Sequence, residues 1–570
     1  MRPLDWVVLV VTLVSIVAYG LYKGRGSKTV NQYLLAGKTM PWYAMGLSIM
    51  ATQASAITFI STTGQAYADG MRFVQFYFGL PVAMVILAAT AVPIFHRAGV
   101  YTAYEYLEKR FDAKTRALAS VIFLIQRGLG VGLALYAPAL VMSVIFGWPD
   151  QLTTLLIGVL VILYTVTGGI PAVTWTDVVQ MGIIFFGLVL SLVLVLRMLP
   201  HSVSVLDAVY LAGAVGKLNA VDTHFDWNNR YNLWSGLLGG SFLALSYFGC
   251  DQSQVQRYLT GKSIAQSKLS LLFNAMAKVP MQFFILFVGA MVFVFYLFQA
   301  PPVLFQPNAM REISGQAEFS GVQRKFDSAF EQRRAAARAI GHAGDPASRR
   351  LHVGEFKAAQ QQLNGARQQA IALFEKAEGK KGFNDNNYVF LTFVTTYLPA
   401  GVVGLIIAVI FAAAMSASSG EVNSLATVTV IDIYKRHVRK QASDRHYLMA
   451  SRLATAFWGL YAVAFAQYGK NLGSLVEAVN LVGSFFYGSL LGVFTLAFGF
   501  RSVGGTAAFW GMAVGEAAIL LVARFTAISY LWYNVIGAVV VIVTGLLLSR
   551  PFPNLRNQDA LDQQGGNVHG

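Results

Sequence analysis

The stretch FAAAMSASSGEVNSLATVTVIDI, Phe411–Ile433, decides the fold, because it is long enough to cross a membrane but consists largely of small and hydroxyl side chains. Small residues let helix backbones approach closely, and hydroxyls at membrane depth need partners. Ser416 and Ser419 share one helix face, which Ala413 extends. A carbonyl and two hydroxyls on one face suit an alkali cation. A tightly packed helix whose serines bond to their own backbone explains the same pattern, so both interpretations remain open at this point.

The composition indicates a polytopic membrane protein. Of 570 residues, 56% are hydrophobic and 12% are charged, about half the share of a typical soluble domain. The net charge of +16 comes mostly from short loops between apolar runs, as the positive-inside bias produces, and this excludes nucleic-acid binding. The single Cys250 excludes an internal disulfide and a cysteine metal cluster. The first apolar run is followed by KGRGSK without a cleavage site, which predicts a retained helix.

The apolar segments predict an all-α protein with about 13 transmembrane helices in the inner or plasma membrane. Basic residues concentrate in alternate short loops, which places the N-terminus outside and the C-terminus in the cytoplasm. The predicted spans are 4–22, 43–66, 74–95, 117–146, 152–168, 172–198, 232–250, 269–299, 389–433, 447–468, 474–499, 505–524 and 528–549.

A charged insertion divides the membrane domain into a first part, 1–300, and a second part, 388–550, with a polar cytoplasmic tail at 551–570. Residues 301–390 hold 13 Lys+Arg and 9 Asp+Glu, so 22 of the chain's 70 charges lie there. Runs such as RKFDSAFEQRRAAARAI favour helix, and 301–387 is predicted to form an external helical hairpin. Its role as a lid, an arm for a protein partner or a neutral insertion remains open.

Several separated motifs give the chain a specific resemblance. They are YTAYEYLEKRFDAKTR (101–116), LYAPAL (135–140), TGGIPAVTWTDVVQ (167–180), YFGCDQSQVQRYLTGKS (247–263) and the VIDIYKR exit (430–436) of the serine-rich helix. Together they resemble the sodium:solute symporter family over roughly 5–300 and 388–550. The branch that carries iodide, monocarboxylates and water-soluble vitamins is the most similar.

The resemblance implies a LeuT-type core of two inverted five-helix repeats that begins at 43–66, with 4–22 as an extra leading helix. Seven core helices would precede the insertion, and three core helices and two extra helices would follow it. The first helix of each repeat would be broken near the bilayer midplane. The run SIMATQASAITF (48–59) and the glycines of 232–250, Gly239, Gly240 and Gly249, fit such breaks. The polar residues could instead serve helix–helix contact.

The resemblance also implies a sodium site formed by the carbonyls of Ala51, Ala54 and Ala413 and the hydroxyl of Ser416. The family usually has a second hydroxyl at the next position, which is Ala417 here. This departure removes one oxygen ligand and leaves coupling to protons open.

A second sodium site of some members would comprise Asp177, Ser416 and Ser419, with Gly420 where that pattern has serine. An intramembrane carboxylate is unfavourable unless it is paired, protonated or bound to a cation. Asp177 could alternatively be a hydrogen-bonded helix cap.

The predicted solute cavity departs from that of the sugar carriers. Thr58, Tyr77 and Ala244 replace a Gln, a Glu and an Asn of those members, and this argues against a hexose because hydroxyl recognition needs matched polar partners. Tyr247 would be the inner gate. The candidate substrate-binding residues are Gln53, Ser55, Thr58, Gln75, Tyr77 and Tyr247, although each aromatic could instead belong to a packed helix interface.

Three further charges lie deep in predicted spans. Arg127 and Glu421 are predicted to form a charge pair, or Glu421 to be a proton site. Lys278 either attracts an anionic substrate or extends toward the cytoplasm.

These observations predict a sodium-coupled symporter that imports a small organic solute, of the carboxylate or another anionic class, by alternating access. Sodium is the only metal ion expected, and no cofactor is. Proton coupling, a sugar substrate, and a transporter-like sensor are the alternatives. An enzyme is not expected, because the spans lack clustered His, Asp and Glu.

Overall fold

The computed structural model describes residues 1–146, 149–201, 203–342, 345–379, 381–467 and 475–553. Helices make up the regular structure of these residues, and β-pairing within them is confined to the isolated bridges Met40–Gly261 and Val503–Pro553. The predicted all-α class is therefore confirmed. Most of the predicted polar tail, from residue 554 onwards, lies outside the described residues.

The helices fall into three groups along the chain. Those before the charged insertion are α1 (Pro3–Gly24), α2 (Val30–Leu35), η1 (Ala36–Lys38), α3 (Trp42–Gln53), α4 (Ala56–Asp69), η2 (Met71–Tyr77), α5 (Leu80–Ala89), α6 (Ala91–Ala98), α7 (Ala103–Arg110), α8 (Ala113–Phe146), α9 (Asp150–Arg197), α10 (Val205–Ala214), η3 (Ser235–Gly239), α11 (Gly240–Gly249), α12 (Gln252–Leu259) and α13 (Ile264–Phe298). The insertion contains α14 (Pro307–Ser314), α15 (Phe319–His342) and α16 (Pro346–Glu378). After it come α17 (Asn386–Tyr397), α18 (Val402–Val428), η4 (Thr429–Val438), α19 (Asp444–Ala466), α20 (Leu475–Gly499), α21 (Gly505–Phe525) and α22 (Leu531–Leu548).

Among the described residues, ten helices are long and apolar enough to cross a membrane, and the pair α3–α4, bent by 57°, is an eleventh candidate. The long helix α9 reverses at Gly169, whose φ of +59° favours glycine. A Cβ on Gly20 of α1 would lie 3.7 Å from Tyr164 and 2.8 Å from Thr176, so the two arms of α9 lie side by side. Counting the two arms of α9 separately gives a twelfth, and the predicted number of about 13 stays a prediction.

Two helix breaks lie in the core. The first separates α3 from α4 at Ala54 and Ser55, within the predicted run. The second lies at Cys250 and Asp251, between α11 and α12, directly after Gly249 of the predicted segment, whereas Gly239 and Gly240 lie before α11 and at its start. A Cβ on Gly240 would lie 2.7 Å from the Phe76 carbonyl oxygen, so this glycine permits close packing rather than a break.

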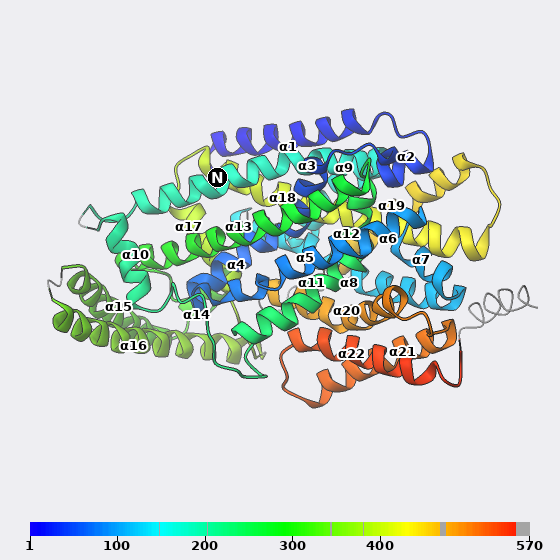
Figure 1. Ribbon diagram of the computed structural model, residues 1–570. Helices are drawn as coiled ribbons and strands as arrows, with labels where there is room; N and C mark the ends of the chain where they lie inside the picture. Colours follow the sequence, from blue (N-terminus) through cyan, green and yellow to red (C-terminus); the bar gives the residue numbers. More distant parts are fainter. Residues whose placement is uncertain (147–148, 202, 343–344, 380, 468–474, 554–570) are drawn as a thin grey trace, which may run out of the picture.

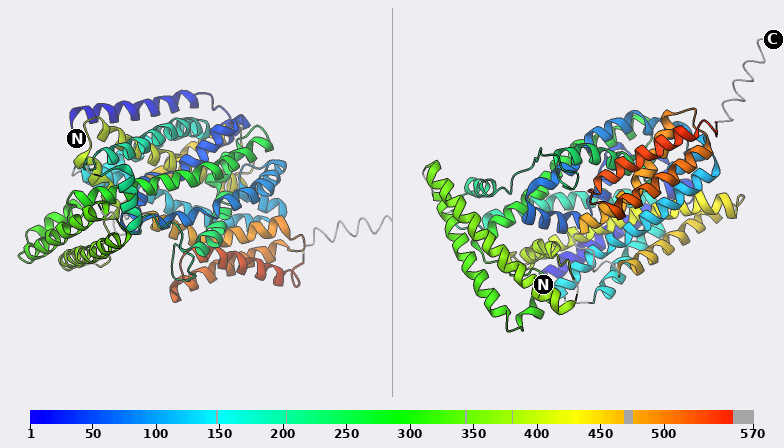
Figure 2. Two further views of the ribbon diagram at one scale, coloured as in Figure 1. Left: turned by 60° about the vertical axis from the view of Figure 1, so that its left-hand side comes forward. Right: turned by 90° about the horizontal axis from the view of Figure 1, so that it is seen from below.

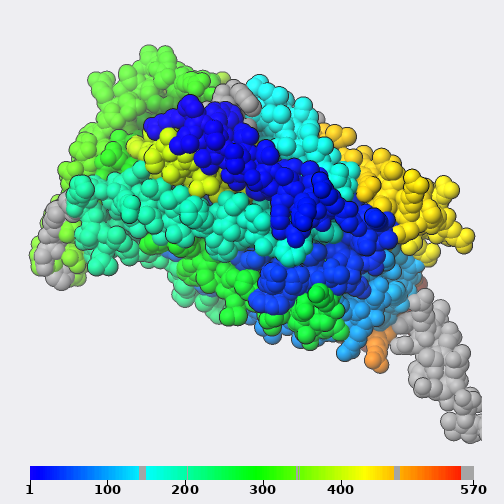
Figure 3. All heavy atoms as spheres, turned by 90° about the horizontal axis from the view of Figure 1, so that it is seen from above, coloured from blue at the N-terminus to red at the C-terminus, as the bar shows by residue number. Residues whose placement is uncertain are grey.

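The serine-rich helix α18 is the central element of the bundle. It is buried along almost its whole length and packs against α1, α3, α4, α8 and α9. Its start is held by Asp5 of α1, whose carboxylate accepts hydrogen bonds from the amides of Gly401 at 2.6 Å and Gly404 at 3.1 Å. A carboxylate at a helix N-terminus satisfies free N–H groups and complements the helix dipole. The leading helix, which lies along the outside of the bundle, therefore anchors α18 (Figure 3).

The insertion forms a hairpin of α15 and α16 that projects from one end of the bundle (Figures 1 and 2). Apolar side chains bury the contact between its helices, including Phe326, Phe330 and Leu363. The N-terminus lies at the same end, whereas α2, α6 and α7, which adjoin the basic loops, lie at the other end (Figure 1). With the positive-inside bias, this arrangement favours an external hairpin.

We predict that Gly64→Ala lowers the midpoint of thermal unfolding in detergent by several degrees. A Cβ at this position of α4 would lie 1.9 Å from the Asn386 carbonyl oxygen, and overpacking of this kind destabilises by about 1–3 kcal/mol. Gly182→Ala on α9 is the matched control, because a Cβ there meets no atom within 4 Å. Equal midpoints for the two variants would contradict the close packing of α4 on α17.

Candidate ion- and solute-binding site

The first break ends α3 beside α18, at Ala54 and Ser55. The last carbonyls of a helix have no N–H partner within the helix beyond its end. At the end of α3 the Met50 carbonyl accepts from Ala54 N–H at 2.8 Å, and the Gln53 carbonyl accepts from Thr58 Oγ1 at 3.3 Å. Ala51 and Ala54 are fully buried, and so are Ala413 and Ser416 on α18, which packs against α3. The residues of the predicted first sodium site thus come from two adjoining elements.

Asp177 connects four elements of the core. Ser48 of α3 and Ser416 of α18 each donate a hydrogen bond of 2.5 Å to its carboxylate, and Arg257 of α12 places Nη1 3.3 Å from Oδ2. Asp177 itself is fully buried on α9, about two turns past the Gly169 reversal. It is therefore not a cap at a helix end, and that alternative is wrong.

Arg257 gives a physical reason for one departure from the family pattern. A Cβ on Gly420 would lie 2.0 Å from Arg257 Nη2, so only a glycine leaves room for the guanidinium beside Asp177. Ser419, one residue earlier, donates to the Ser416 carbonyl at 3.1 Å and so is bonded to its own helix. The hydroxyl expected at position 420 is thus replaced by a cation from another helix.

A cavity of about 100 Å³, here called the break cavity, lies against the first break. Five predicted substrate residues line it, namely Gln53, Ser55, Thr58, Tyr77 and Tyr247, together with Ala417, Asn480 and Tyr487. Gln75 does not, because its amide donates to the Tyr231 carbonyl and accepts from Asp222 N–H, both at 2.9 Å.

Arg127 and Glu421 meet at the wall of the break cavity. Arg127 Nη1 donates to Glu421 at 2.8 Å, and Nη2 bonds to Tyr487 Oη at 2.8 Å and forms a salt bridge with Asp251. Asp251, at the second break, was not among the residues singled out from the sequence. A carboxylate at the end of an apolar span was the available signal, in YFGCDQ. The two breaks and α18 are thus joined by one ionic cluster.

Lys278 of α13 is a buried cation that lies against Tyr77, one of the residues lining the break cavity. Its side chain is 0% exposed, its Nζ lies 5.7 Å from the Tyr77 ring centroid, and no hydrogen-bond partner for it exists among the described residues. The alternative in which it extends to the cytoplasm is therefore wrong. Asn274 and Gln282 lie one turn to either side, and their amides are likewise buried without partners in the described chain.

The sequence model of the sodium:solute symporter family matches residues 33–321 and 368–515. The chain belongs to the sodium:solute symporter family. It is therefore a multi-pass membrane transporter that couples solute movement to sodium. The unmatched residues 322–367 include most of the α15–α16 hairpin.

Individual relatives support the same conclusion. This symporter is 27% identical to the sodium/sialic acid symporter NanT of Aliivibrio fischeri, over 98% of this chain and 95% of that protein. It is 27% identical to the human sodium-coupled monocarboxylate transporter 1, over 86% of this chain and 68% of that protein. A solved Na+-coupled sialic acid symporter, in a substrate-bound outward-open state, has the same fold, with a TM-score of 0.75 at 24% identity and coverage of 96% and 98%.

We predict that Gly420→Ala destabilises the symporter because it displaces Arg257 from Asp177. The expected loss is about 1–3 kcal/mol, measured as unfolding stability in detergent. In an Arg257→Ala background the same change should have almost no effect, because the space is then empty. Additive effects of the two substitutions would contradict the contact.

Proposed function

We propose that this symporter imports a small organic carboxylate together with sodium, and that the solute binds in the break cavity. The observation that carries the proposal is the charge around the breaks. Three buried cations, Arg127, Arg257 and Lys278, accompany three buried carboxylates, Asp177, Asp251 and Glu421. Their formal charges cancel before any ligand binds. A sodium ion adds one positive charge, and an anionic solute restores neutrality in a region where unpaired charge is unfavourable.

Lys278 supports an anionic rather than a neutral solute. The other two cations contact carboxylates, whereas Lys278 Nζ lies beneath Tyr77, which lines the break cavity. A buried ammonium without a partner attracts any anion that enters nearby. The modest volume of about 100 Å³ favours a short carboxylate over a large one. Acidic solutes also agree with the names of two relatives, the sialic acid and monocarboxylate symporters.

Sodium would bind at the oxygens where α18 meets α3 and α9. Oxygen ligands suit hard cations, and the proposed donors are the carbonyls of Ala51, Ala54 and Ala413 and the hydroxyl of Ser416, with Asp177 and Ser419 at a second position. Ser416 belongs to both groups, so the two positions are adjacent.

Arg257 competes with sodium for Asp177 in this scheme. The guanidinium stands 3.3 Å from Oδ2, and a cation bound to the same carboxylate would displace it. Arg257 lies on α12, directly after the second break, so its release changes the contacts of that repeat. An ion can shift a conformational equilibrium only through such differential contacts.

Proton coupling is a second candidate, favoured by one observation. Glu421 Oε2 is buried without a hydrogen-bond partner among the described residues, while Oε1 accepts from Arg127. A carboxyl with one free oxygen in such a place could carry a proton.

We expect proteoliposomes to accumulate labelled short carboxylates, such as lactate or pyruvate, under an inward sodium gradient. Lys278→Met should raise the KM about tenfold or more, whereas Lys278→Arg should retain most of the affinity because it keeps the charge. Uptake that ignores sodium and follows external acid would favour the proton alternative. Uptake of glucose in preference to the carboxylates would overturn the anionic class.

The sodium concentration for half-maximal uptake should respond to three substitutions in different ways. Ser416→Ala removes an oxygen donor and should raise it severalfold. Ala417→Ser adds a hydroxyl and should leave it unchanged or lower it. Arg257→Gln removes the competing cation and should lower it. A sodium requirement that rises in Arg257→Gln would contradict competition at Asp177.

A further inference from the structure

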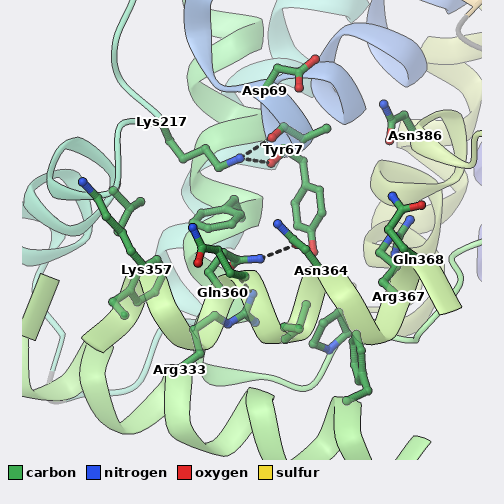
Figure 4. A pocket seen from close by; sticks show the side chains of 18 residues that line it. Tyr67, Asp69, Lys217, Arg333, Lys357, Gln360, Asn364, Arg367, Gln368 and Asn386 are labelled. Carbon is green, nitrogen blue, oxygen red and sulfur yellow. Dashed lines mark hydrogen bonds between the residues drawn. The ribbon is translucent and has the colours of Figure 1, made fainter. Parts of the chain in front are cut away.

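A second, larger cavity lies between the hairpin and the end of the membrane bundle, here called the hairpin cavity (Figure 4). Its volume is about 540 Å³, within the usual range of small-molecule sites. One wall is the hairpin, with Arg333 on α15 and Lys357 on α16. The opposite wall is the end of α4, Tyr67 to Asp69, together with Lys217. Most hairpin residues of this wall fall within 322–367, outside the family match, so this cavity is a feature of the insertion.

Cations dominate the lining of the hairpin cavity. Lys217, Arg333, Lys357 and Arg367 contribute four positive charges, and Asp69 is the single carboxylate among the lining residues. Arg367 has a salt bridge with Asp385. Within the described chain, the other three cations have no salt bridge. The hairpin cavity therefore carries positive charge that the protein itself does not neutralise.

Two of these cations are held in place by neutral oxygens. Lys217 Nζ donates to the carbonyls of Tyr67 at 2.7 Å and Ala68 at 2.5 Å, as the dashed lines in Figure 4 show. Arg333 is 1% exposed and donates to the Tyr296 carbonyl at 2.7 Å and to Gln360 at 2.9 Å, and its Nε is buried without a partner in the described residues. Buried charges that lack counter-ions are unfavourable, and a bound anion would relieve this.

The pKa values of Lys217 and Arg333 are consistent with buried cations that lack counter-ions. Burial lowers the pKa of Lys217 to about 8, with Asp69 opposing the shift and Arg333 and Arg72 adding to it by repulsion. Burial also lowers the pKa of Arg333 to about 10. Each charged form is therefore disfavoured when no anion is bound.

Uncharged polar side chains complete the hairpin cavity. Gln360, Gln361, Asn364 and Gln368 line it from α16, and Asn386 lines it from the other side (Figure 4). Amides both donate and accept hydrogen bonds, so they match hydroxyl and carbonyl groups better than they match a bare inorganic ion.

The geometry points to a binding site for a hydroxylated organic carboxylate in the hairpin cavity, separate from the break cavity. The carboxylate meets Arg333 and Lys217, the exposed Lys357 adds positive charge to the lining, and the hydroxyls meet the amide side chains of α16. Because Lys217 and Tyr67 belong to the transport core, the bound molecule joins the hairpin to the end of α4. The site faces the side that the charge distribution predicts to be external.

The test is titration calorimetry on the purified full chain carrying Lys278→Met, which leaves the hairpin cavity intact while weakening the proposed central site. D-glucuronate should bind saturably, and D-glucose, which lacks the carboxylate, should not. Lys217→Gln and Lys357→Gln should each raise the Kd about tenfold or more. Lys357 is exposed, so its removal leaves folding intact. Arg338→Gln, an exposed α15 residue outside the lining, is the matched control and should change nothing.

Affinity should also fall between pH 7 and pH 9, because Lys217 loses its proton in that interval and with it the charge that attracts the carboxylate. Absence of D-glucuronate binding, equal binding of D-glucose, equal competition by chloride at the same concentration, or binding unchanged in both lysine variants would each overturn the proposal. Since every arm is measured in the Lys278→Met background, these outcomes do not depend on whether the transported solute is a carboxylate.

Discussion

The contacts of Asp177 are the constraint on which the rest of the core depends. This fully buried carboxylate receives hydroxyls from α3 and α18 and lies beside a guanidinium from α12, while it stands on α9. Removal of one partner from a buried charged group usually destabilises by about 3–5 kcal/mol. Separation of the four elements would therefore leave this carboxylate unpaired unless another cation or a proton neutralised it. In the proposed scheme a sodium ion does so, which would link ion occupancy to helix arrangement.

The second ionic cluster repeats the same principle at the break cavity. Arg127 joins Glu421 on α18 to Asp251 at the second break, and Tyr487 of α20 bonds to the same guanidinium. Both clusters use α18 as one partner and α12 or its preceding break as another. A change in either cluster thus alters the contacts of the same two elements. In the proposed scheme, this would couple ion binding to solute binding.

The sequence predicted the features that follow from local pattern. Apolar length located the spans, and the polar run 48–59 located the first break. At the second break the glycines did not share one role, because Gly240 serves a close backbone approach while Gly249 directly precedes the break at Cys250 and Asp251. The sequence predicted the pair of Arg127 with Glu421, but the other partners, Asp251 of Arg127 and Asp177 of Arg257, were beyond local reasoning because each lies more than 75 residues away along the chain from its arginine. Gly420 illustrates the limit, because its small size has meaning only once Arg257 is known to lie against it.

The helix α4 lies between the two cavities and so connects the hairpin to the transport core. Its first turn lines the break cavity through Ile57 and Thr58, and its end lines the hairpin cavity through Tyr67 to Asp69. With 14 residues it is about 20 Å long and carries no proline, so a displacement of the helix would carry both of its ends. A displacement of α4 that opens one cavity therefore alters the other. Ligands that prefer different positions of one rigid element must change each other's affinity by the same factor. An insertion outside the family match can thus influence transport while leaving the residues of the ion site unchanged.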